Sequence, residues 1–240
     1  ATRPLTGGFV PPRVDLSHLP TTLSEGEKSD LPVRHDAREL GIVSPVKNQG
    51  ACGACYAFAA AGDLEARVLR DYGTLADASE NHLKECHFEE QSCAGGNAQI
   101  VANLLTAVGA VDEACDPYQA SDVACLGGCD PTFAALSWEW IAGDVVPTTD
   151  LIKQAILDHG PISTSVYAGD SQAPTWQGQF SSWNGGDGLY YAGDETNNHA
   201  VMIVGWDDDH PHAGGGTGCW IVRNSWGEGW GDACGHGDSG

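Results

Sequence analysis

Nine cysteines constrain the fold of this 240-residue chain more than any other feature of its sequence. So many thiols are unusual in a reducing cytosol, and they are typical of a chain that folds in an oxidising compartment, where cysteines pair. An odd count predicts pairs plus one free thiol. Because eight cysteines can be joined in many ways, the count alone does not say which cysteine stays unpaired.

The charge of the chain excludes two classes of partner. With 33 acidic and 11 basic side chains, the formal net charge is −22, which repels the phosphates of nucleic acids and anionic membrane surfaces. Hydrophobic residues make up 41 % of the chain, so its acidity does not indicate disorder. We interpret the acidity as a solvated surface, and a high-salt or acidic habitat is the alternative that charge alone leaves open.

Neither a membrane anchor nor a leader is predicted from the sequence. Apolar runs such as 200–206 are far shorter than the roughly 20 residues that span a bilayer. Residues 1–10 lack the charged start and apolar stretch of a signal peptide. We therefore expect no membrane partner and, if the protein is exported, a processed form.

Apolar spacing and capping residues predict a helical first half and a mostly β second half. Residues 1–30 are rich in Pro, Thr and Ser and predict an extended arm. We expect helices at 55–73, 79–86, 97–109 and 149–160, and strands at 162–167, 200–206 and 219–223. This order is typical of an α+β fold with two lobes, here residues 31–138 and 139–240, and a cleft between them.

Three segments carry residues suited to nucleophilic catalysis. Cys55, in 48-NQGACGACYAF-58, stands at a predicted helix start, where the partial positive charge of the helix favours the thiolate. His199 precedes the apolar run of 197-NNHAVMIVGW-206, and Asn224 follows the predicted strand in 219-CWIVRNSWGEGW-230. A thiol nucleophile needs a base, and the base needs a group that fixes its orientation, so these three side chains can form one site.

In this order the three motifs resemble the papain-like cysteine peptidases, the papain and cathepsin family, whose C-G-[SA]-C-[WY] element is followed by a distant His and Asn. The resemblance spans about residues 31–235 and begins at 31-LPVRHDARELGIVSPVKNQG-50. It implies a papain-like two-lobe fold, with a helical left lobe, an antiparallel β-barrel-like right lobe and the active-site cleft between them. It also implies a secreted, prokaryotic-looking member.

The same resemblance implies the roles of the catalytic residues. Cys55 would be the nucleophile, His199 its general acid and base, and Asn224 the residue that orients the imidazole. The Gln49 side-chain amide and the Cys55 backbone N–H would stabilise the oxyanion. Trp226 would shield the bond between His199 and Asn224 from water, which strengthens it.

For substrate binding, the resemblance points to Gly95 and Gly96 in 92-SCAGG-96, a wall that hydrogen-bonds an extended peptide at close range. We expect Ser165 and Asn197 to border the pocket for the side chain two residues before the cut. Asn198, where plant members often have Asp, is also expected to contact substrate.

The resemblance also pairs four of the cysteines. It implies disulfides Cys52–Cys93 and Cys86–Cys125, whereas Cys115–Cys129 and Cys219–Cys234 are our guesses for the remainder. Cys55 is then the odd cysteine, in agreement with the count.

The sequence departs from the family in several places. Tyr56 replaces the usual Trp after the nucleophile, and we expect altered packing with retained activity. After 225-SWGEGWG-231 the chain reads 232-DACGHGDSG-240 where the family continues into a Gly-Tyr-led strand, so we expect part of the β lobe and of the specificity pocket to be missing or replaced. We expect no long inhibitory pro-segment of the kind that eukaryotic members carry, so that the 30-residue arm alone precedes the domain.

Two functions remain open at this point. The first is a secreted, monomeric endopeptidase that acts on polypeptides, needs no cofactor or metal, and is a target for proteinaceous inhibitors. The second is a catalytically silent or self-blocked papain-fold binding protein at a surface. We expect the arm to pack on the domain and to enter the cleft, and the acidic stretch 207–212 to be a solvated loop without a metal.

Overall fold

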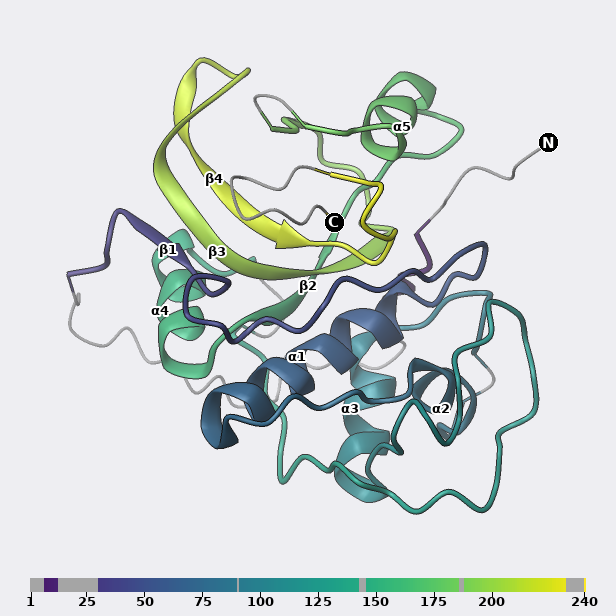
Figure 1. Ribbon diagram of the computed structural model, residues 1–240. Coiled ribbons are helices and arrows are strands. Elements are labelled where there is room, and N and C mark those ends of the chain that lie inside the picture. Colours follow the sequence, from purple (N-terminus) through teal and green to yellow (C-terminus); the bar gives the residue numbers. More distant parts are fainter. Residues whose placement is uncertain (1–6, 13–29, 90, 143–145, 186–187, 232–239) are drawn as a thin grey trace.

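A long antiparallel strand, β3 (His199–His212), organises the half of the molecule that holds the sheet in the computed structural model (Figure 1). It pairs with β1 (Arg34–Asp36), β2 (Ile162–Val166) and β4 (Gly216–Arg223), all antiparallel. The structure describes residues 7–12, 30–89, 91–142, 146–185, 188–231 and 240. Helices on one side and an antiparallel sheet on the other confirm the predicted α+β class.

Local capping explains where the helices of the first half begin and end. The helix α1 (Cys55–Tyr72) ends at Gly73, which adopts a left-handed conformation with φ of 65° and donates its N–H to the Leu69 carbonyl. The side chains of Ser79 and Asn97 accept backbone N–H groups at the starts of α2 (Glu80–Glu85) and α3 (Ala98–Ala107). These helices pack on one another around α1 in the lower half of Figure 1.

The sheet extends further than the sequence predicts. The strand β3 continues through Asp207–His212 and pairs with β4 as far as His212 opposite Gly216, so our prediction of a solvated loop there is wrong. Asp207, Pro211 and His212 pair with β4 on either side of a register shift, and the Asp208 N–H donates to the Val33 carbonyl at 2.9 Å. The side chains of Asp207 and Asp208 are 28 % and 42 % exposed. Lys153 binds Asp208 at 2.5 and 2.7 Å.

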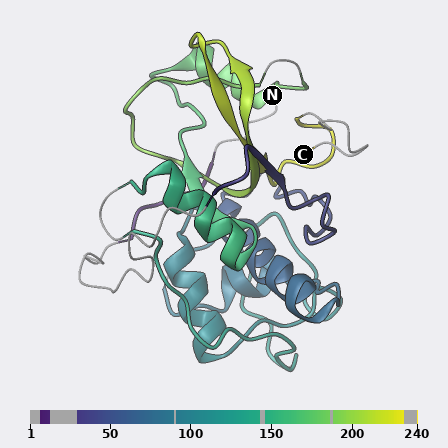
Figure 2. The same cartoon turned by 90° about the vertical axis from the view of Figure 1, so that its left-hand side faces the viewer.

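Two further helices accompany the sheet. Figure 2 shows α4 (Thr149–His159) at the junction between the helices and the sheet, where it contacts β2 and β3. The predicted helix at 149–160 is therefore confirmed, and the backbone N–H of Gly160 donates to Ile156 at its end. The sequence did not predict α5 (Pro174–Ser181), which begins with a proline in its first turn, nor β1, whose three residues are too short to show a pattern.

Three disulfides tie the helical half together. They join Cys52 to Cys93, Cys86 to Cys125 and Cys115 to Cys129, the same pairs that we predicted. The expected bond from Cys219 to Cys234 and the altered C-terminal segment lie outside the described residues. Three bridges are typical of a chain that folds in an oxidising compartment.

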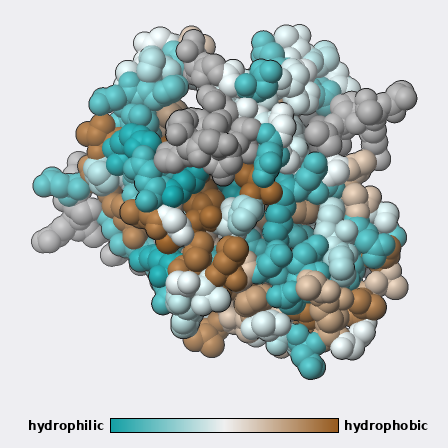
Figure 3. All heavy atoms as spheres, in the orientation of Figure 1, coloured by the Kyte–Doolittle hydropathy of each residue, from teal (hydrophilic) through white to brown (hydrophobic). Residues whose placement is uncertain are grey.

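Among the described residues, no helix is long and apolar enough to cross a membrane. The face shown in Figure 3 carries many hydrophilic residues, with hydrophobic residues gathered in separate groups between them. The hydrophobic core lies inside, with the largest cluster between α1, α3 and β3.

Candidate active site

The three residues that the motifs single out come together where the helices meet the sheet. Cys55 is the first residue of α1, His199 is the first residue of β3, and Asn224 directly follows β4. The His199 Nε2 atom lies 2.8 Å from Asn224 Oδ1. The other ring nitrogen, Nδ1, is buried and has no hydrogen-bond partner among the described residues, so it is the nitrogen that remains for a proton transfer.

The sulfur of Cys55 is enclosed by backbone donors. It accepts the N–H of Gly8 at 3.0 Å and the N–H of Ala200 at 3.3 Å. Because the thiol is fully buried, desolvation raises its pKa to about 11, although these N–H groups act in the opposite direction. Our expectation of a thiolate is therefore wrong for this state, in which burial outweighs the helix N-terminus.

The imidazole of His199 is neutral for the same reason. Burial lowers its pKa to about 4, and the hydrogen bond to Asn224 compensates only in part. Thiol and imidazole are both uncharged while the site is covered.

Gln49 reaches the start of α1 from a segment that joins the two halves. Its Nε2 donates to the Cys52 carbonyl at 2.8 Å, and its Oε1 accepts the Ser225 hydroxyl at 2.6 Å. Its backbone N–H donates to the Ser225 carbonyl and its carbonyl accepts the Tyr118 hydroxyl, both at 2.8 Å. The side chain is thus held with its amide group beside the turn that precedes Cys55.

Aromatic rings cover the outer side of His199. The Trp226 ring lies 4.7 Å from the imidazole, centroid to centroid, and Phe180 of α5 contacts both rings at 5.3 and 6.1 Å. Trp230 completes this cluster. Trp226 therefore lies beside His199, where a shield for the His199–Asn224 bond would have to be. Phe180 was not predicted, because no motif in the sequence points to it.

Gly96 pairs with the N-terminal arm. Its N–H donates to the Gly8 carbonyl at 2.8 Å, and its carbonyl accepts the N–H of Val10 at 2.8 Å. This is a parallel bridge between Phe9 and Gly96. In Figure 1 the described arm segment, residues 7–12 in purple, lies beside the start of α1. A Cβ on Gly95 would come within 2.5 Å of the Gly8 carbonyl oxygen, so the wall needs glycine there.

Two glycines let the arm lie directly on the sulfur. A Cβ on Gly8 would lie 1.8 Å from the carbonyl oxygen of Gly53, and one on Gly7 would lie 2.1 Å from that of Asn198. No larger residue fits this path without moving the chain. The signal that could have identified these residues is the Gly-Gly pair itself, within an otherwise Pro- and Thr-rich arm.

The predicted pocket residues lie nearby, and their side chains bond to the sheet and its loops. The Asn198 side chain bonds to the backbone of Ala168 and Gly169, each at 2.9 Å, while its carbonyl accepts the Phe9 N–H at 3.1 Å. The Asn197 amide donates to the carbonyl and hydroxyl oxygens of Ser165 at 3.1 and 3.0 Å. Of these three residues, Asn198 is the one that bonds to the described part of the arm. Within the described part of the chain, no group of three His, Cys, Asp or Glu side chains is placed to hold a metal.

A family model of papain family cysteine proteases matches residues 31–236. Cathepsin K of Mus musculus is 34 % identical over 232 residues, which are 95 % of this chain and 65 % of that protein. Digestive cysteine proteinase 2 of Homarus americanus is 34 % identical over 204 residues, 82 % of this chain and 58 % of that protein. The chain thus spans 58 to 65 % of the length of these two curated relatives.

Solved structures show the same similarity. Digestive procathepsin L2 from Tenebrio molitor larval midgut superimposes with a TM-score of 0.75 at 28 % identity, covering 94 % of this chain and 70 % of its own. A recombinant stem bromelain precursor gives a TM-score of 0.72 at 27 % identity, covering 94 % and 67 %.

Proposed function

Because the chain belongs to the papain family of cysteine proteases, we propose that it is a cysteine-type peptidase that cleaves within polypeptide chains. The observation that carries the proposal is the 2.8 Å contact between His199 Nε2 and Asn224 Oδ1, beside the Cys55 sulfur that accepts the N–H of Ala200 at 3.3 Å. This contact fixes the imidazole and leaves Nδ1 for the thiol, which is the division of roles that a Cys-His-Asn site needs.

The reaction begins when the thiol proton of Cys55 moves to His199 Nδ1 and the sulfur attacks the carbonyl carbon of the substrate. The oxyanion accepts hydrogen bonds from the Gln49 side-chain amide and from the Cys55 N–H. The C–N bond then breaks as His199 returns the proton to the leaving amine, and a thioester remains. A water molecule gives a proton to His199 and attacks the thioester, which releases the acid and restores the thiol.

We further infer that the arm holds this enzyme in a latent form. The Gly8 N–H, rather than a carbonyl carbon, faces the sulfur, so the arm occupies the site without offering a bond to cleave. Two similar solved structures are themselves a procathepsin and a bromelain precursor. Substrates, and protein inhibitors that enter the same cleft, would have to displace the arm.

A self-blocked binding protein is the second candidate, since the arm covers the nucleophile. The two candidates differ in whether the block is reversible. A latent enzyme becomes active when the arm leaves, whereas a permanently silent protein does not.

The test is an active-site titration of the 240-residue chain and of its Gly8→Ala variant with an epoxide thiol inhibitor. We expect one label per molecule, located at Cys55 by mass spectrometry, and loss of peptide hydrolysis in proportion to labelling. Cys55→Ser is the control and should neither label nor cleave. If peptide hydrolysis survives in Cys55→Ser, or if neither protein cleaves any member of a peptide library, the peptidase proposal fails.

A further inference from the structure

Tyr56 is the residue after the nucleophile, where relatives usually carry Trp, and the reaction outlined above does not use it. Its side chain is fully buried. A Cβ on Gly96 would lie 2.6 Å from two of its ring carbons. The ring therefore fills the space directly beneath the residue whose backbone pairs with the arm.

Gly96 is the last residue of a short segment, residues 92–96, that we call the strip. The phenol of Tyr56 reaches the other end of this strip. Its hydroxyl donates to the Ser92 carbonyl at 3.3 Å. This carbonyl also accepts the N–H of Gly95 at 3.1 Å, which closes the turn that leads into Gly95 and Gly96. One side chain thus contacts both ends of residues 92–96, and a single peptide bond joins it to Cys55.

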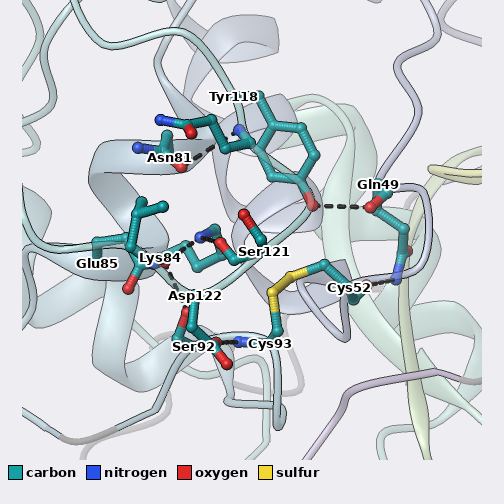
Figure 4. The surroundings of a disulfide bond; sticks show 12 residues. Gln49, Cys52, Asn81, Lys84, Glu85, Ser92, Cys93, Tyr118, Ser121 and Asp122 are labelled. Carbon is teal, nitrogen blue, oxygen red and sulfur yellow. Dashed lines mark hydrogen bonds and ion pairs between the residues drawn. A yellow bond between two sulfur atoms is a disulfide. The ribbon is translucent and has the colours of Figure 1, made fainter.

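Apart from this turn and the two bonds of Gly96 to the arm, the hydrogen bonds that the structure describes for residues 92–96 lie at the beginning of the strip. Figure 4 shows the Cys52–Cys93 disulfide, with the Cys93 N–H directed at Asp122, 2.8 Å away. The Ser92 hydroxyl donates to Glu85 at 2.7 Å. These contacts fix residues 92 and 93. The distance of Gly96 from the Cys55 sulfur therefore depends on the Tyr56 ring, which packs against Gly96, and on the turn closed by the Gly95 N–H.

We propose that Tyr56 is a positioning residue that sets the 92–96 strip, and hence an extended substrate, at a fixed distance from the Cys55 sulfur. The proposal rests on the peptidase function proposed above. Peptides that lie along Gly96 use the wall that Tyr56 braces. Small reagents that reach only the sulfur do not.

Tyr56→Phe tests the hydroxyl alone, because it keeps the ring and the packing. The assay uses 240-residue chains that all carry Gly8→Ala, so that the arm is displaced. The matched control is Tyr72→Phe, which removes an exposed hydroxyl from the other end of the same helix. Each protein is assayed with a peptide that has four residues before the cut and with a single-residue amide.

We expect Tyr56→Phe to raise KM for the long peptide about three- to tenfold, the effect of one lost neutral hydrogen bond. Its kcat, its KM for the short amide and its rate of alkylation by iodoacetamide should not change, and Tyr72→Phe should match the parent in all four. An unchanged KM for the long peptide overturns the proposal. An equal fall in kcat for both substrates also overturns it, since that result indicates a merely structural role.

A second readout does not depend on activity. In the chain that retains Gly8, hydrogen exchange of the Gly95 amide should become at least threefold faster in Tyr56→Phe, because the carbonyl that holds it loses its second donor. If the parent cleaves no peptide, the proposed function fails while this measurement still decides whether Tyr56 braces the turn. Unchanged exchange at Gly95 refutes the bracing role.

Discussion

Replacing Gly8 by alanine should switch the site from covered to open. The Cβ would lie 1.8 Å from the Gly53 carbonyl oxygen, whereas Cβ contacts essentially never fall below 3.0 Å. The arm must therefore retreat by about 1.2 Å, the difference between these two values. This breaks the 3.0 Å bond from the Gly8 N–H to the sulfur and the 2.8 Å bond from the Gly96 N–H to the Gly8 carbonyl.

The size of the effect follows from those two bonds. Each bond contributes about 0.5–1.5 kcal/mol, so losing both destabilises the position of the arm over the sulfur by about 1–3 kcal/mol. This corresponds to a roughly 5- to 150-fold shift of the equilibrium from the covered to the uncovered site. We expect hydrolysis of a fluorogenic peptide by the Gly8→Ala variant to rise within this range. Alkylation of Cys55 by iodoacetamide should rise in parallel, because both need the sulfur uncovered.

Gly127→Ala is the control, because a Cβ there meets nothing within 4 Å and the residue lies in a different loop. It should leave both rates unchanged. If Gly8→Ala leaves hydrolysis and alkylation at the parent values, or lowers them, the contact seen between arm and sulfur does not govern access, and the latency argument is refuted.

Three other perturbations test the electrostatics. Lys47→Met should lower the free energy of unfolding in denaturant titrations by about 3–5 kcal/mol, because the side chains of Glu65 and Glu80, 0 % and 2 % exposed, lose the cation between them. The control Arg67→Ala breaks an exposed ion pair and should lower the free energy of unfolding by less than about 0.5 kcal/mol. Equal losses in the two variants would contradict this prediction. In the parent chain with the arm closed, the ultraviolet absorbance of the Cys55 thiolate, taken as the difference from Cys55→Ser, should stay low up to about pH 9 and rise towards about pH 11, because burial beneath the arm raises the pKa of the thiol to about 11. A rise that is complete below about pH 9 would contradict this. Raising NaCl from about 0.05 M to about 1 M should increase Tm, since salt screens the repulsion within a chain of net charge −22; a flat or falling Tm would show that the charges are already balanced locally.

Features that local chemistry determines were predictable from the sequence. The end of α1 follows from Gly73, and the starts of α2 and α3 follow from Ser79 and Asn97, whose side chains cap their own helices. Val108 shows the limit of such reasoning. It shares the apolar spacing of α3, yet it is 46 % exposed because the helix ends at Ala107.

Features that depend on distant contacts were not predictable. The three residues of β1 become a strand only because β3 offers Gly205–Asp207 as a partner. The polar end of β3 becomes a strand because β4 pairs with it. The motifs indicated which side chains would meet at the site, but the path of Gly7 and Gly8 over the sulfur depends on carbonyl groups of Gly53 and Asn198 that no local pattern reveals.

The state of the thiol shows which of two opposing effects is larger. A helix N-terminus stabilises a nearby negative charge by about 0.3–1 kcal/mol, and by about 2 kcal/mol in partly buried sites. Burial raises the Cys55 pKa to about 11, a change of roughly 3 kcal/mol in favour of the neutral thiol relative to a thiol in water. The helix alone is therefore too weak to ionise the sulfur beneath the arm. Water must return to the cleft before Cys55 and His199 can exchange their proton, so the arm that blocks substrate also keeps the nucleophile uncharged.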